Sequence, residues 1–119
     1  MLSKENRLKK KQHFNYIYKH GQGLRVGEIS LVFIKAKVKP FKVGFSVSNK
    51  IGKAVVRNKV KRRMREAFSS LTSLVDRRYN YIFIAKEGIA DKDFNAIKKN
   101  MISVIKKAGL FNEIDNKNN

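Results

Sequence analysis

A run of cations between residues 52 and 68 constrains the fold more than any other feature of this sequence. The segment reads GKAVVRNKVKRRMREAF, and six of the nine positions from 57 to 65 are Lys or Arg. Apolar side chains recur through the same segment at three- and four-residue spacing, namely Val56, Val60, Met64, Ala67 and Leu71, with Phe68 at the edge of this stripe. Such spacing is typical of one face of a helix. Because like charges four residues apart oppose helix formation by a few tenths of a kcal/mol per pair, we expect the apolar face to hold this helix against a sheet.

The whole chain shares this excess of positive charge. It carries 28 Lys and Arg against 9 Asp and Glu, a formal net charge of +19. Self-repulsion of this size destabilises a compact state, so the chain is expected to work beside a polyanion. Nucleic acid is the favoured partner, because neutralised phosphates release counterions and drive binding. A membrane surface or an acidic protein is the less favoured alternative.

Length and composition indicate a single domain. The chain has 119 residues, of which 42% are hydrophobic, enough for one modest core. We expect one domain over residues 1–119, with residues 1–5 and 112–119 frayed. The absence of cysteine excludes disulfides, and no apolar run approaches the roughly 20 residues that span a bilayer. The basic N-terminus lacks the apolar centre of a secretion signal, so a soluble, cytoplasmic protein with no membrane partner is expected.

Three segments predict a sheet. Residues 29–37, ISLVFIKAK, are rich in β-forming residues, and residues 41–48, FKVGFSVS, alternate strictly between the two sides of a strand. This pattern predicts an antiparallel hairpin with one half-buried strand. Residues 81–85 are apolar throughout, which places this strand in the interior of the sheet.

Helices are predicted at both ends of the chain. Residues 11–20 predict a short helix that ends at Gly21 in the position after the C-cap. A second amphipathic helix is indicated by Phe94, Ile97, Met101, Val104, Ile105 and Ala108. We expect Asp91 to cap it and Gly109 to end it. The order helix, strands, helix, strand, helix predicts a small two-layer α+β sandwich.

The polar face of the central helix is the first candidate site. Arg57, Lys61 and Arg65 lie beside the apolar stripe, Asn58 and Arg62 continue the face, and Glu66 is the sole acid between positions 50 and 71. A charge run is usually a solvated surface. Here acids are nearly absent, which favours binding to a phosphate backbone.

Two aromatic residues of the first helix are the second candidate site. Phe14 and Tyr18 are one turn apart and can stack on unpaired bases. The spacing alone favours core packing. The alternative stays open because basic residues surround the pair: Arg7, Lys9, Lys10, Lys11 and Lys19.

No catalytic or metal site is predicted in the protein. His13 and His20 are seven residues apart and could act as an acid–base pair on RNA, but a solvated His13 and a His20 beside a helix C-terminus are simpler readings. Asp91 and Asp93 stand where a helix needs caps. The chain has neither converging carboxylates for a metal nor a glycine-rich phosphate loop, so it is not expected to be an enzyme alone.

Three segments of the chain resemble the bacterial ribonuclease P protein subunit. They are NRLKKKQHFNYIYKHG, VGFSVSNKIGKAVVRNKVKRRMREAF and YNYIFIAKEG, in matching order. The central one is similar to the Arg-Asn-Arg signature of that family. Lys59 stands where the family usually has its second Arg, which keeps the charge and removes a forked contact.

The resemblance implies a ribonucleoprotein. In that family a large RNA carries the active site and its Mg²⁺, and the protein, which binds no cofactor itself, assists removal of the 5′ leader from precursor tRNA. The signature helix contacts the RNA subunit, and the matching residues here are Arg57, Asn58, Lys59, Lys61, Arg62 and Arg65. The leader lies in a cleft between the first helix and the sheet, matched by Phe14 and Tyr18, with Lys61 and Arg65 close to it. A further cleft aromatic of the family falls at Val32 or Phe33.

The resemblance also implies a fold similar to the second domain of ribosomal protein S5, with a left-handed β-α-β crossover. A basic structural ribosomal protein is the main competing assignment, and the RNA that co-purifies distinguishes the two. A DNA-binding module would instead select duplex sequences, and a protein-only nuclease would cleave leaders without RNA.

Overall fold

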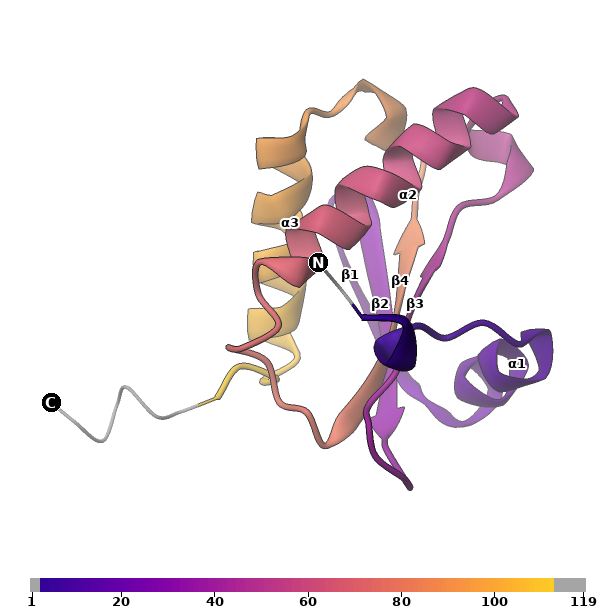
Figure 1. Ribbon diagram of the computed structural model, residues 1–119. Helices are drawn as coiled ribbons and strands as arrows, with labels where there is room; N and C mark the ends of the chain where they lie inside the picture. The colour runs from indigo at the N-terminus through magenta and orange to yellow at the C-terminus, as the bar shows by residue number, and fades with distance from the viewer. Residues whose placement is uncertain (1–2, 113–119) are drawn as a thin grey trace, which may run out of the picture.

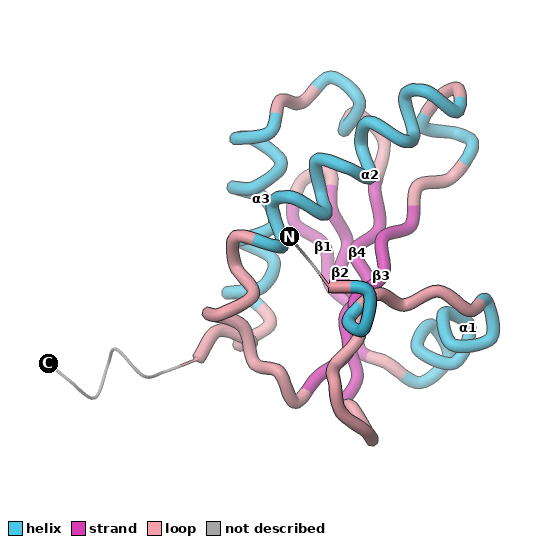
Figure 2. The backbone as a smooth tube through the Cα atoms, in the orientation of Figure 1, coloured by secondary structure: helices cyan, strands magenta, loops and turns pink. Residues whose placement is uncertain are grey.

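The computed structural model describes residues 3–112 and has the predicted order of elements (Figures 1 and 2). The helices are α1 (Lys11–His20), α2 (Ala54–Ser69) and α3 (Phe94–Lys107), and the strands are β1 (Gln22–Val26), β2 (Ile29–Lys35), β3 (Val43–Ser46) and β4 (Tyr79–Ala85). Three short 3-10 helices, Lys4–Asn6, Asn49–Ile51 and Ile89–Asp91, connect them. The predicted α+β class is confirmed.

The strand pairing differs from the predicted hairpin. The sheet has the order β1-β2-β4-β3, so β2 pairs antiparallel with β1 and with β4, and β3 pairs parallel with β4 alone. A hairpin of residues 29–37 with residues 41–48 was therefore wrong. The hairpin partner of β2 is β1, reached through Gly27 at φ 57°. Sequence patterning missed β1 because it is a largely exposed edge strand with few apolar residues.

Strand β4 lies in the interior of the sheet, as predicted from the apolar run at residues 81–85. It lies between β2 and β3, and α2 connects the parallel pair β3 and β4. Its side chains alternate between two apolar clusters. Tyr81, Phe83 and Ala85 belong to the main core, whereas Ile82 belongs to a smaller cluster on the other face.

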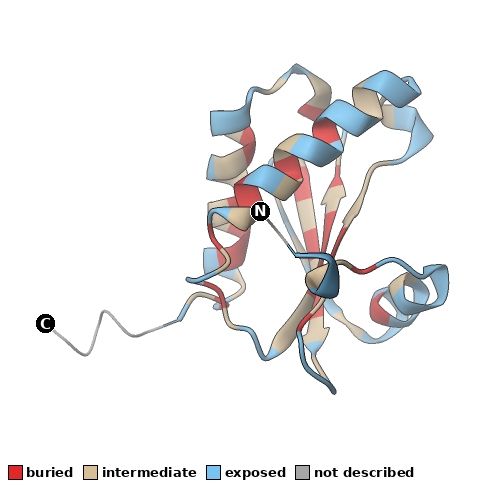
Figure 3. Cartoon of the chain, viewed as in Figure 1, coloured by how far each residue is buried: buried red, intermediate tan, exposed pale blue. Residues whose placement is uncertain are grey.

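The two faces of the sheet are covered by different helices. Helices α2 and α3 cover the face that holds the main core (Figure 3). Of the predicted stripe, Val60, Met64, Ala67 and Phe68 of α2 are buried there, as is Leu71 just after the helix, whereas Val56 is half-buried. On the opposite face, Ile17 of α1 and Leu8 pack on Ile82. This partial third layer places α1 over β2 and β4 on one face of the sheet, and α2 on the other.

Two predictions about helix ends were wrong: Asp91 does not cap α3, and Gly21 is the C-cap of α1 and not the residue after it. The cap of α3 is Asp93, whose Oδ1 accepts from the Ala96 N–H at 2.9 Å, and Asp91 instead ends a 3-10 helix. Gly21 does end α1, but its φ of −82° is open to any residue. Gly109 ends α3 with φ 74°, as expected of a left-handed C′ residue.

The expected fraying concerns both ends of the chain, and residues 1, 2 and 113–119 lie outside the described residues. Within them, the Asn6 side chain donates to the Phe41 carbonyl at 2.8 Å. The Asn112 N–H donates to the Leu74 carbonyl at 2.8 Å. Both described ends are therefore bonded to the body of the domain.

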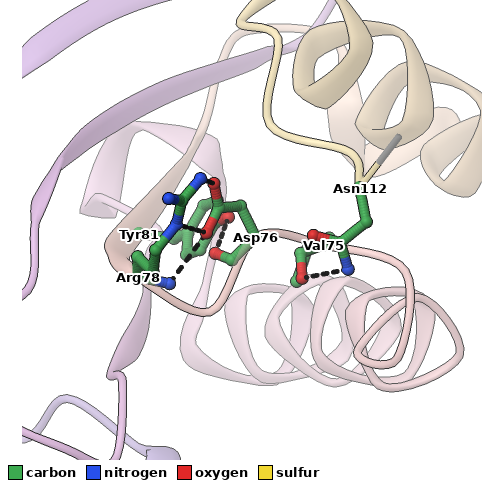
Figure 4. A network of polar contacts seen from close by, with 5 residues as sticks. All are labelled: Val75, Asp76, Arg78, Tyr81 and Asn112. Atoms are coloured by element: carbon green, nitrogen blue, oxygen red, sulfur yellow. Dashed lines mark hydrogen bonds and ion pairs between the residues drawn. The ribbon is translucent and has the colours of Figure 1, made fainter. Parts of the chain in front are cut away.

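The loop before β4 is fixed by a polar network (Figure 4). The Tyr81 hydroxyl donates to the Asp76 carbonyl at 2.6 Å, and the Asn112 amide donates to the Val75 carbonyl at 3.2 Å. Arg78 donates to the Asp76 carboxylate from its backbone N–H, Nε and Nη2, at 2.9, 3.0 and 2.8 Å. These hydrogen bonds hold the pKa of Asp76 below its ordinary value of 3.8.

Gly21→Ala should destabilise the domain by about 2 kcal/mol, because close packing cannot absorb the added atom. A Cβ at Gly21 would lie 2.7 Å from the Ile17 carbonyl oxygen and 2.8 Å from that of Phe33, both backbone atoms. Gly23→Ala is the matched control, since its Cβ would meet nothing nearer than 3.6 Å. Urea unfolding at fixed salt measures both, and an equal loss in the two variants would contradict the steric explanation.

Asp76→Asn should destabilise the chain in a pH-dependent way. A carboxyl whose pKa is lowered by folding stabilises the native state above its unfolded pKa, and this contribution is lost as pH falls through the lowered value. The difference in unfolding free energy between the wild type and Asp76→Asn should therefore be largest near neutral pH and shrink below pH 3.8. Urea unfolding over this range at constant ionic strength measures it; a difference that grows on acidification would refute the account.

Candidate RNA-binding surfaces

The polar face of α2 is largely open to solvent. Asn58, Lys59, Lys61 and Arg62 are exposed, as a binding surface requires. Arg57 is half-buried, and its Nη1 donates to the Gly52 carbonyl at 2.8 Å, which fixes this cation at the start of the helix. The predicted side chains therefore form one rigid cationic face.

One cation in the run has a structural role instead. The Nη1 of Arg63 donates to the Lys92 carbonyl at 2.8 Å, and this hydrogen bond ties α2 to the segment before α3. Arg63 is accordingly separate from the candidate binding residues of α2.

The aromatic residues of α1 divide between packing and exposure. Ile17 is the buried residue of α1, Phe14 is half-buried beside it, and Tyr18 is 41% exposed. The ring centroids of Phe14 and Tyr18 are 6.3 Å apart. Core packing thus explains Ile17 and part of Phe14, and leaves Tyr18 open to a partner.

The glycine of β3 makes room for Phe14. A Cβ at Gly44 would lie 2.5 and 2.7 Å from two ring atoms of Phe14, so the ring rests directly on the strand backbone. The register of β2 also shows which of Val32 and Phe33 faces α1. Val32 packs in the α1 cluster, whereas Phe33 is buried in the main core, so β2 gives this cleft an aliphatic residue.

A cavity of about 220 Å³ lies between the N-terminal segment, β3 and α2. It is lined by Arg7, Leu8, Lys9, Val43, Gly44, Phe45, Lys61 and Arg65. Lys61 and Arg65 thus lie near the strand on which Phe14 rests, and their predicted role on both surfaces stays a prediction. The sequence analysis named Arg7 and Lys9 only as basic neighbours of Phe14 and Tyr18, because the bridge between Arg7 and Val43, which brings them to this cavity, is not visible in the sequence.

Two guanidinium groups in this cavity have an unsatisfied donor. The Nε atoms of Arg7 and Arg65 are buried and have no hydrogen-bond partner among the described residues. Burying a donor without an acceptor costs about 1–3 kcal/mol. The one ion pair within residues 3–112 joins Arg78 to Asp76, so no carboxylate neutralises the cavity. A phosphate oxygen would supply both the acceptor and the charge.

The two histidines, which were considered as an acid–base pair, lie in different surroundings. His20 packs on Tyr16, with ring centroids 4.6 Å apart, whereas His13 lies among lysines near the start of α1. In the part of the chain that the structure describes, no three His, Cys, Asp or Glu side chains come close enough to hold a metal ion. The same residues include no helix long and apolar enough to cross a membrane.

Comparison with known proteins identifies the family. Residues 2–109 match the model of the family described as Ribonuclease P. The ribonuclease P protein component of Clostridium botulinum is 37% identical over 110 residues, which cover 92% of this chain and 99% of that protein, and the Streptococcus agalactiae protein gives the same values. The chain belongs to the ribonuclease P protein family.

Solved structures agree with this assignment. The RNase P protein of Staphylococcus aureus superposes with a TM-score of 0.83 at 34% identity, covering 92% of this chain and all of that one. The Thermotoga maritima protein gives 0.77 at 26% identity, covering 85% and 96%. Membership makes this chain the protein component of an RNA-containing ribonuclease that processes the 5′ ends of tRNA, in place of a structural ribosomal protein.

Arg65→Met should stabilise the isolated chain by about 1 kcal/mol at low salt, because it removes an unsatisfied buried donor and keeps the apolar stem. Arg62→Met is the matched control, since Arg62 is exposed on the same helix. Urea unfolding of both variants measures the difference. If Arg65→Met proves less stable than Arg62→Met, the Arg65 guanidinium supports the fold and is not held ready for a ligand.

Proposed function

We propose that this chain binds the catalytic RNA of ribonuclease P through α2 and holds the 5′ leader of precursor tRNA over α1 and β3. The RNA-binding residues are those of the polar face of α2: Arg57, Asn58, Lys59, Lys61, Arg62 and Arg65. The leader-binding residues are Phe14 and Tyr18, with Lys61 and Arg65. The structure adds Arg7 and Lys9 to this second set as candidates, because they line the same cavity.

The observation that carries the proposal is the cavity between β3 and α2, which lies next to the ring of Phe14 through Gly44. Its floor is Gly44, on which the ring of Phe14 rests, and its wall is formed by Lys61 and Arg65 of α2. A leader stacked on the aromatic residues would therefore run beside the helix that grips the RNA subunit. Bases stack on aromatic rings without regard to sequence, which suits a leader of variable sequence.

The contribution of the protein is positioning and charge neutralisation. Cleavage and its Mg²⁺ belong to the RNA subunit. Two polyanions repel each other, and a chain of net charge +19 between them lowers this repulsion. The side chains on α2 are held by a packed helix, so less entropy is lost on binding than with a flexible basic tail. The proposal places this work in the cytoplasm, with precursor tRNA as substrate and no membrane partner.

Phe14→Ala should weaken binding of precursor tRNA to the reconstituted holoenzyme by roughly ten-fold, since one base–aromatic stack is lost. Binding of mature tRNA, which has no leader, should be nearly unchanged. Gly44→Ala should have the same selective effect, because its Cβ would displace the Phe14 ring. Equilibrium binding of both tRNAs in one buffer measures the ratio.

Arg62→Glu serves as the contrasting variant in the same experiment. It should weaken assembly with the RNA subunit and so reduce binding of both tRNAs together at limiting protein. The proposal is wrong if Phe14→Ala lowers precursor and mature tRNA binding equally. It is also wrong if the isolated chain cleaves precursor tRNA.

A further inference from the structure

A second cavity, of about 200 Å³, lies at the start of α1. It is lined almost entirely by basic side chains: Lys4, Arg7, Lys9, Lys10, His13 and Lys42, with Leu8 as the apolar exception. These residues come from the first 3-10 helix, the segment before α1, α1 itself and the residue before β3. No acidic side chain lines this basic pocket.

The basic pocket has a fixed framework. The Leu8 N–H donates to the Val43 carbonyl at 2.9 Å, and the Leu8 side chain is buried against the sheet. The Lys42 N–H donates to the Asn80 side chain at 2.7 Å, and its ammonium donates to the Glu5 carbonyl. The segment before α1 is therefore fixed to β3. Because it is not a free tail, its cations cannot move apart to reduce their repulsion.

The basic pocket shares three lining residues with the cavity between β3 and α2. Arg7, Leu8 and Lys9 line both cavities, and the unpartnered Nε of Arg7 is buried between them. Phe14 lies one turn nearer to the basic pocket than Tyr18 does, since α1 begins at Lys11. A strand that stacks first on Tyr18 and then on Phe14 is thus directed towards the basic pocket.

The number of cations indicates the kind of phosphate. An internal phosphodiester carries one negative charge, and its neighbours along the strand are several ångströms away. Five Lys or Arg side chains and a histidine line this pocket of about 200 Å³. Their positive charge exceeds the single negative charge of one phosphodiester. A terminal phosphate carries about −1.5 to −2, and a terminal triphosphate carries more. Charge complementarity favours the terminal group.

We infer that the basic pocket binds the 5′-terminal phosphates of a leader whose end reaches it, most strongly the triphosphate of an unprocessed transcript. This inference rests on the proposed leader site. It gives the chain a preference for a particular leader end in addition to its contacts with bases.

The test compares precursor tRNAs that differ only at the leader end. Leaders of graded length, from about 2 to about 10 nucleotides, are prepared with a 5′-triphosphate or a 5′-hydroxyl, and binding to the reconstituted holoenzyme is measured. At the length that reaches the basic pocket, the triphosphate should bind about ten-fold more tightly, as expected of added charge-assisted hydrogen bonds. Shorter leaders should show no difference.

Matched variants test whether the triphosphate advantage depends on the basic pocket. Lys4→Gln with Lys10→Gln should abolish the triphosphate advantage, because both side chains are exposed in the basic pocket and hold no other described side chain. Lys99→Gln with Lys106→Gln removes the same charge from exposed positions of α3 and should keep the advantage. Phe14→Ala should weaken both precursors and keep their ratio.

A direct measurement uses the isolated full chain. Inorganic tripolyphosphate, added at constant ionic strength, should shift the NMR signals of His13 at lower concentration than those of His20. Equal shifts at both histidines would overturn the inference, since they would indicate binding over the whole basic surface.

The two proposals fail in different ways. Absence of a triphosphate advantage at every leader length, with Phe14→Ala still selective for precursor, overturns the terminal-phosphate inference alone. Equal weakening of triphosphate and hydroxyl precursors by Lys4→Gln with Lys10→Gln also overturns it, because the basic pocket would then hold internal phosphates. If wild-type holoenzyme binds precursor no better than mature tRNA, the leader site itself is wrong.

Discussion

The cationic face of α2 depends on the packing of its opposite face against β4. Phe68 lies with its ring centroid 5.4 Å from that of Phe83 and 5.7 Å from that of Tyr81, and Val60 and Met64 are buried beside it. Since the like charges along α2 oppose the helix, these apolar contacts hold it. They also fix the direction in which its cations point, so the charge run forms one side of a rigid helix.

The charges of the chain are largely unpaired within the part of the protein that the structure describes. Within residues 3–112 a single ion pair is formed, and two buried guanidinium nitrogens, on Arg7 and Arg65, have no acceptor. Such groups lower the stability of the isolated chain. A bound phosphate would supply an acceptor for these nitrogens and would lower the repulsion between the cations.

Local sequence patterns predicted the individual helices and strands, but not the way in which distant strands pair. The stripe of α2 and the apolar run of β4 were found because helix and strand periodicity are written along the chain. The pairing of β2 with β3 was wrong because it assumed that successive strands are adjacent. In the fold, β4 lies between β2 and β3 in the sheet, although α2 and β4 follow both of these strands in the sequence. The exposed edge strand β1 has too little apolar pattern to be recognised.

By itself the sequence determined the α+β class, the cationic helix with its buried stripe, and a family resemblance that the comparisons confirm. Tertiary structure decided which side chains meet. It places Val32, and not Phe33, beside α1, and it packs the ring of Phe14 on Gly44. It also brings Arg7 and Arg65 to the same cavity next to β3. Periodicity tells which face of an element is apolar, but contacts between distant segments depend on strand order and register, which emerge only when the whole core packs.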